Sequence, residues 1–129
     1  MTKWLVSCSL GVGIVVQVTC AVAQATTDMD SARALFDDAR LLMKTARYDE
    51  ACPKLEAVKE IYAGPGVLLN LGDCYEKTGR TASAWAAFND ARSTAAAEGR
   101  GEHEAEARRR GAALTAPAAG PQPDLYDHM

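Results

Sequence analysis

The sequence has few of the residues on which enzymatic or metal chemistry depends. Only 2 of its 129 residues are histidine: His103, in a charged stretch, and His128, beside the terminus. A hydrolytic triad needs a base close to a nucleophile, and neither histidine is well placed for that role. No CxxC pair, HExxH motif or Asp-rich calcium loop occurs. These absences predict a protein that is not an enzyme and that holds no metal or other cofactor.

An excess of basic charge is also missing. The 14 Lys and Arg residues are outnumbered by 17 Asp and Glu residues, which gives a net charge of -3. The run Arg108–Arg110 is preceded at four-residue spacing by Glu104 and Glu106, in the order that stabilises a helix. We expect this run to form a solvated helix face, and we expect no nucleic-acid partner. The glycines of Gly99–Gly101 are expected to link two helices, because no strand precedes them to form a phosphate loop.

The long apolar stretch of the chain is confined to its beginning. Lys3 precedes an apolar run from Leu10 to Val18, and Ala21–Ala23 has the small-x-small pattern of a cleavage site. We therefore predict a signal peptide over residues 1–23 and export to the periplasm or the cell envelope. The remainder of the chain is long enough for one small domain.

Two other interpretations of this segment are open. Trp4–Ala23 approaches the roughly 20 apolar residues that span a bilayer, so an uncleaved membrane anchor is the first alternative. Several polar side chains dilute it. Lipidation is the second, but Cys8 lacks a preceding apolar region and the residues before Cys20 match a lipobox poorly. A membrane contact is expected only if the signal is retained.

Patterns typical of β-strands are scarce, and the region 29–114 has helical spacing of apolar residues throughout. The sequence predicts an all-α domain there and a disordered, proline-rich tail over 115–129. Five helices are expected: one capped by Asp28 or Asp30 and ending near Thr45, one from about Tyr48, one after Gly64-Pro65-Gly66, one from Thr81 or Ala82 to about Glu98, and one over Glu102–Ala113.

The first two predicted helices repeat in the next two. Seven positions recur at one constant spacing: Leu35, Ala39, Leu42, Ala46, Ala51, Leu55 and Val58 become Leu68, Gly72, Tyr75, Gly79, Ala84, Phe88 and Ala91. This pattern of small and large residues resembles the tetratricopeptide repeat family, whose period of about 34 residues is close to that spacing. The resemblance implies about two and a half antiparallel helix-pair units in a short right-handed solenoid. Gly72 and Ala84 would allow close helix approach, while Tyr75 and Phe88 would fill the space around them.

A second resemblance concerns location. The segments Glu50–Cys52 and Asn70–Glu76, followed by Gly79-Arg80, are similar to exported repeat proteins of myxobacteria and related soil bacteria. This likeness supports an exported helical repeat and adds no activity.

Loss of the signal would leave two cysteines, Cys52 and Cys74, which are either a disulfide or two buried thiols. The repeat geometry implied by the resemblance places them on facing helices, so we expect a disulfide between them. Trp85 occupies the place of Cys52 in the second copy. We expect it to pack on the fifth helix as part of the core.

Tetratricopeptide folds bind partners in a concave groove lined by the first helix of each repeat. The resemblance assigns eight residues to this groove: Arg33, Phe36, Arg40, Lys44, Leu69, Asn70, Asp73 and Lys77. Asn70 stands where carboxylate-clamping members keep an asparagine, but Phe36 and Arg40 replace the lysine and asparagine of that clamp. A mixed apolar and cationic groove suits an acidic-hydrophobic peptide segment or helix.

The sequence therefore favours an exported scaffold that binds another envelope protein or peptide. One alternative is a structural protein whose apolar faces serve only to form homo-oligomers. Another is a thiol oxidoreductase, in which Cys52 and Cys74 would exchange with other thiols.

Overall fold

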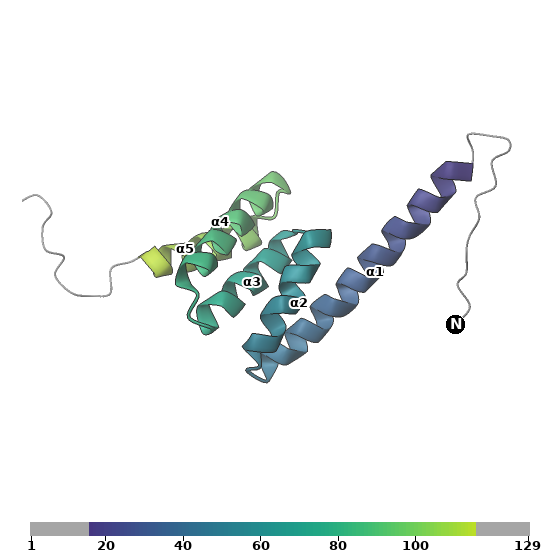
Figure 1. Ribbon diagram of the computed structural model, residues 1–129. Coiled ribbons are helices and arrows are strands. Elements are labelled where there is room, and N and C mark those ends of the chain that lie inside the picture. Colours follow the sequence, from purple (N-terminus) through teal and green to yellow (C-terminus); the bar gives the residue numbers. More distant parts are fainter. Residues whose placement is uncertain (1–15, 116–129) are drawn as a thin grey trace, which may run out of the picture.

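The chain folds into five consecutive helices, each packed antiparallel against the next (Figure 1). The computed structural model describes residues 16–115, with side chains from residue 26 onward. Within residues 16–115 there is no strand, which confirms the all-α prediction. The predicted tail after Thr115 and residues 1–15 of the predicted signal lie outside the described residues. The helices are α1 (Val16–Lys44), α2 (Tyr48–Ile61), α3 (Pro65–Lys77), α4 (Thr81–Ala97) and α5 (Gly101–Thr115).

Helix α1 is longer than the sequence predicted. It begins at Val16, so Asp28 and Asp30 lie inside a continuous helix and do not cap its start. The preceding residues of the helix contain no glycine or proline, so no strong helix breaker ends the helix there. The first part of α1 runs beyond the neighbouring helices (Figure 1), and Ala32 is its first buried side chain among those described. Over residues 16–115, no helix combines the length and apolar character that crossing a membrane requires.

The turns that end α1, α3 and α4 share one backbone conformation. Ala46, Gly79 and Gly99 have positive φ angles of 59°, 77° and 67°. In each turn the N–H of the next residue donates to the carbonyl five residues earlier, at 2.8 to 2.9 Å. This closure satisfies carbonyl groups that the helix end leaves free. Ala46 and Gly79, which are equivalent positions of the two sequence copies, therefore end their helices in the same way.

The core consists of three clusters of small and large side chains between the helices. Phe88 is fully buried, and its ring lies so close to Gly72 that a Cβ added at Gly72 would come within 2.6 Å of it. The predicted close approach of α3 and α4 at Gly72 is therefore confirmed. The other core residues come from every helix: Ala32, Ala39, Leu42, Ala51, Leu55, Val58, Val67, Leu68, Leu71, Tyr75, Ala84, Ala87, Ala91, Ala95 and Ala107.

A disulfide joins Cys52 of α2 to Cys74 of α3, with a Cα–Cα distance of 5.6 Å. Both residues are buried. The predicted pairing is confirmed, and it links the helix pair α1–α2 covalently to the pair α3–α4.

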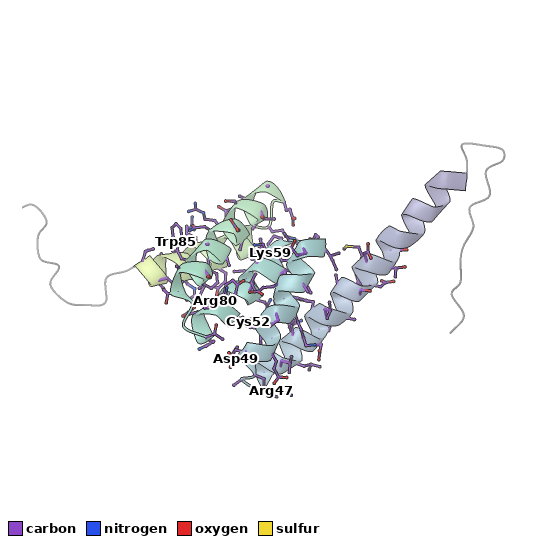
Figure 2. All side chains as sticks on the ribbon, in the orientation of Figure 1. Arg47, Asp49, Cys52, Lys59, Arg80 and Trp85 are labelled. Atoms are coloured by element: carbon purple, nitrogen blue, oxygen red, sulfur yellow. A yellow bond between two sulfur atoms is a disulfide. The ribbon has the colours of Figure 1, made fainter. Side chains whose placement is uncertain are left out.

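The prediction that Trp85 belongs to the core is wrong. Trp85 is 45% exposed on α4, on the side of the molecule away from α1 (Figure 2). The reason lies in the side chains with which α5 packs on α4. Helix α5 faces α4 with Ala107 and Gly111, and a Cβ at Gly111 would lie 3.7 Å from Phe88. Small residues bring α5 close to α4, which leaves no space for an indole between them.

Candidate functional site

Helix α3 lies between α1 and α5, and two cavities open between these helices. The first, which we call the apolar cavity, has a volume of about 260 Å³ and is lined by Met29, Ala32, Arg33, Phe36, Val58, Tyr62, Gly66, Val67 and Arg100. The second, the charged cavity, has a volume of about 500 Å³ and is lined by Met43, Tyr48, Asp73, Glu76, Lys77, Arg109, Arg110 and Ala113.

The base of the apolar cavity belongs to the folded core. Ala32, Val58 and Val67 are buried and contact one another, with Phe36 packed against them. The rim is different, because Met29 and Tyr62 leave 45% and 43% of their surfaces exposed. Apolar side chains at a rim that opens onto a buried apolar base form a surface from which a ligand would displace water favourably.

The short link between α2 and α3 places Tyr62 at this rim. The ring of Tyr62 lies against Gly64, where an added Cβ would come within 2.3 Å of the ring. Pro65 follows as the first residue of α3, which fixes the chain direction where Gly66 and Val67 enter the cavity wall. The Gly64-Pro65-Gly66 sequence therefore shapes the cavity as well as separating the two helices.

The charges of the apolar cavity are all positive. Arg33 makes no ion pair or hydrogen bond with any residue that the structure describes. Arg100 lies 3.7 Å from Glu98, with half of its side chain exposed. None of the nine lining residues carries a carboxylate. Nearby, the guanidinium of Arg40 is 5.8 Å from the centre of the Phe36 ring. The cavity thus combines an apolar base with cations that no carboxylate of its lining neutralises.

In the charged cavity, by contrast, both carboxylates of the lining are paired with an arginine of the same lining. Arg110 pairs with Asp73 and, at 2.6 Å, with Glu76, and it stacks 5.0 Å from the centre of the Phe88 ring. Burial alone would lower the pKa of Arg110, but the hydrogen bond with Glu76 and the charge of Asp73 outweigh it and raise that pKa. The pairing of Arg110 with Glu106 is present but longer, at 3.9 Å. This cavity is held together by its own ion pairs.

The eight residues predicted for the groove have different positions. Arg33 and Phe36 line the apolar cavity, whereas Asp73 and Lys77 line the charged one. Arg40 stacks beside the apolar cavity, and Lys44 is exposed and lines neither cavity. Leu69 is partly buried against the core. The Nδ2 of Asn70 donates to the carbonyl oxygen of Gly66 at 2.7 Å, so this amide already has an intramolecular partner.

The predicted groove contains only two of the nine residues that line the apolar cavity, and Met29, Tyr62 and Arg100 are among the seven that sequence reasoning did not assign to a site. Tyr62 and Arg100 belong to links between helices, and Met29 precedes the first residue with a counterpart in the next copy. A comparison of equivalent helical positions in the two copies does not reach such residues. For Tyr62 the available signal is its place in the apolar pair Ile61-Tyr62 directly before the break at Gly64.

A separate cluster connects α2 to the turn between α3 and α4. The hydroxyl of Tyr75 donates to Oε1 of Glu56 at 2.7 Å, and Arg80 lies 3.1 Å from the same oxygen. The Arg80 guanidinium is 4.1 Å from the centre of the Tyr75 ring. Burial, followed by the bond to Glu56, raises the pKa of Tyr75 to about 12. The same hydrogen bond lowers the pKa of Glu56. We interpret this cluster as a structural contact between the helix pairs.

Comparison with models of protein families and with curated proteins finds no match to this chain. Among residues 16–115, no group of three or more His, Cys, Asp or Glu side chains is arranged to hold a metal ion. The apolar cavity is therefore the feature from which a function is inferred.

Proposed function

We propose that this protein is an exported tetratricopeptide-like scaffold that binds an acidic-hydrophobic segment of another cell-envelope protein. In this proposal its helices form about two and a half repeat units in a short right-handed solenoid. The recurrence of one helix-ending turn at Ala46 and Gly79 supports the repeat. The Cys52–Cys74 disulfide supports export, because disulfides persist in oxidising compartments.

The apolar cavity carries the proposal. Its buried base and exposed rim suit aliphatic or aromatic side chains, and Arg33 and Arg100 suit carboxylates beside them. A ligand with both features would bury apolar area and also compensate the guanidinium charges. Neither feature alone would use the whole site.

The test is selection of ligands from a library of displayed peptides. We expect selected peptides to combine aliphatic or aromatic residues with flanking Asp or Glu. Arg33→Glu together with Arg100→Glu should weaken their binding by at least tenfold, because repulsion replaces attraction at the two exposed cations of the cavity lining. Arg92→Glu is the matched control, since Arg92 is exposed on α4 and lines neither cavity. Equal binding by both variants would contradict the proposal.

A self-associating structural protein is the second candidate, because large apolar side chains are also exposed outside both cavities. Leu41 on α1 is 60% exposed and Trp85 on α4 is 45% exposed. Sedimentation equilibrium over a hundredfold range of concentration distinguishes the two. A mass that rises with concentration and falls back with Leu41→Ser or Trp85→Ser, without any selected peptide, would favour the structural role.

A thiol oxidoreductase is disfavoured by burial. Cys52 is 5% exposed and Cys74 is fully buried, whereas exchange requires attack on an accessible sulfur.

A further inference from the structure

We infer that the chain carries its own ligand for the apolar cavity, the segment Asp124-Leu125-Tyr126-Asp127, and that this segment competes with the external partner. The inference rests on the proposed function, because it concerns the same site. The four residues lie in the part of the chain that follows the described region, which ends at Thr115.

The chemistry of the segment matches that of the cavity. Leu125 and Tyr126 are adjacent apolar residues. The other apolar residues of the stretch 116–129 are alanine, proline, glycine and Met129. Asp124 and Asp127 flank them, so two apolar side chains stand between two carboxylates. The cavity has the complementary arrangement, an apolar base with Arg33 from α1 and Arg100 from the link before α5. Burial of the two side chains and pairing of the charges would act together.

The connecting chain is long enough for this contact. Arg100 lines the cavity at the start of α5, and the described chain ends at the other end of this helix. A helix of 15 residues is about 22 Å long at 1.5 Å per residue. The nine residues from Ala116 to Asp124 span up to about 30 Å when extended. The segment therefore reaches the cavity of its own molecule along α5.

A tether of this length makes a weak contact effective. A short flexible linker produces an effective concentration in the millimolar range. A segment with a dissociation constant of about 100 μM would then occupy the cavity in roughly nine molecules of ten. An external ligand would bind about tenfold more weakly, because it binds only the open fraction. Partner binding would thus require displacement of the segment.

The experiment compares full-length chains with a synthetic peptide as probe. The probe is a fluorescein-labelled peptide of residues 121–129, and its binding is followed by fluorescence anisotropy. The chain with Leu125→Ser and Tyr126→Ser should bind the probe about tenfold more tightly than the natural chain. The matched control, Ala118→Ser with Ala119→Ser, changes two residues of the same tail to serine and should behave as the natural chain does. Arg33→Glu added to the first variant should abolish the gain.

The outcomes separate this inference from the proposed function. Equal binding of the probe by the natural chain and the Leu125/Tyr126 variant overturns the inference. If peptides selected from the library still bind both chains equally, the proposed function stands without it. If no peptide binds any chain, both fail. A dimer of the natural chain that the Leu125/Tyr126 variant loses would also overturn the inference, because the segment would then occupy a neighbouring molecule.

Discussion

Contact between Gly72 and the ring of Phe88 determines how closely α3 and α4 approach. Alanine usually stabilises a helix interior relative to glycine, but here its Cβ would come within 2.6 Å of the ring. We predict that Gly72→Ala lowers the free energy of unfolding by about 1–3 kcal/mol, measured by urea denaturation. Gly111→Ala is the control, because its Cβ would lie 3.7 Å from Phe88, and it should raise stability by up to about 1 kcal/mol. Equal changes in the two variants would contradict this account.

Tyr75 should give stability a specific dependence on alkaline pH. Burial and the bond to Glu56 raise the pKa of Tyr75 from 10.0 to about 12 in the folded chain. A tyrosine whose pKa is raised by folding stabilises the folded state fully at any pH below its pKa in the unfolded chain. This stabilisation is lost as the pH rises from 10 to 12. We expect the natural chain to be more stable than Tyr75→Phe by about 1 kcal/mol at pH 8. This difference should shrink above pH 10 in urea denaturation. A difference that is constant from pH 8 to 11.5 would argue against the bond.

At the scale of helices, Ala46 is an alanine in a conformation that favours glycine. Its φ angle of 59° is close to the φ angle of 77° that Gly79 has in the equivalent turn. A left-handed conformation costs a residue with a Cβ about 1–2 kcal/mol, and glycine relieves part of that cost. We predict that Ala46→Gly raises the midpoint of thermal unfolding, with a gain of up to about 1 kcal/mol. Gly79→Ala should lower it by a similar amount. Opposite signs in a calorimetric measurement of the two variants are the decisive result.

The middle helices could be predicted because their boundaries depend on local chemistry. Gly64-Pro65-Gly66 must interrupt a helix and can begin the next, and Gly79 suits the turn that ends α3. The start of α1 could not be predicted in this way, because Asp28 is a good capping residue only where the preceding chain leaves the helix. The exposure of Trp85 depends on Ala107 and Gly111, the small residues with which α5 faces α4. The repeat pattern does not contain the way in which α5 packs.

The same distinction applies to the site. The sequence pattern assigned Arg33 and Phe36 to a ligand-binding surface, and both line the apolar cavity. It also assigned Asp73, which is engaged by Arg110 from the last described helix. A pair between distant helices depends on how α5 is placed, and helical periodicity does not contain that information.

At the scale of the whole molecule, we expect the disulfide to supply stability that a short stack of helices lacks. Helical repeats are stabilised by their neighbours, and this chain has only five helices over its described residues. We predict that Cys52→Ala with Cys74→Ala lowers the free energy of unfolding by about 3 kcal/mol, as expected for loss of a loop with a sequence separation of 22. Urea denaturation of the variant and of the reduced natural chain should agree. A loss below about 1 kcal/mol would mean that packing alone holds the two helix pairs together.

The position of the disulfide also determines how the molecule responds to mechanical tension. A force on the two ends of the chain is carried across the bond between Cys52 and Cys74, and the residues between them bear none of it. With the bond intact, those residues do not contribute to the length of the fully extended chain. That length is therefore shorter than in the reduced chain by roughly 70 Å, at about 3.4 Å per residue. Most of α2 after Cys52, and α3 up to Cys74, stay inside the closed loop. A molecule anchored at one end and pulled by a partner at the other would thus keep this loop while α1, α4 and α5 unravel.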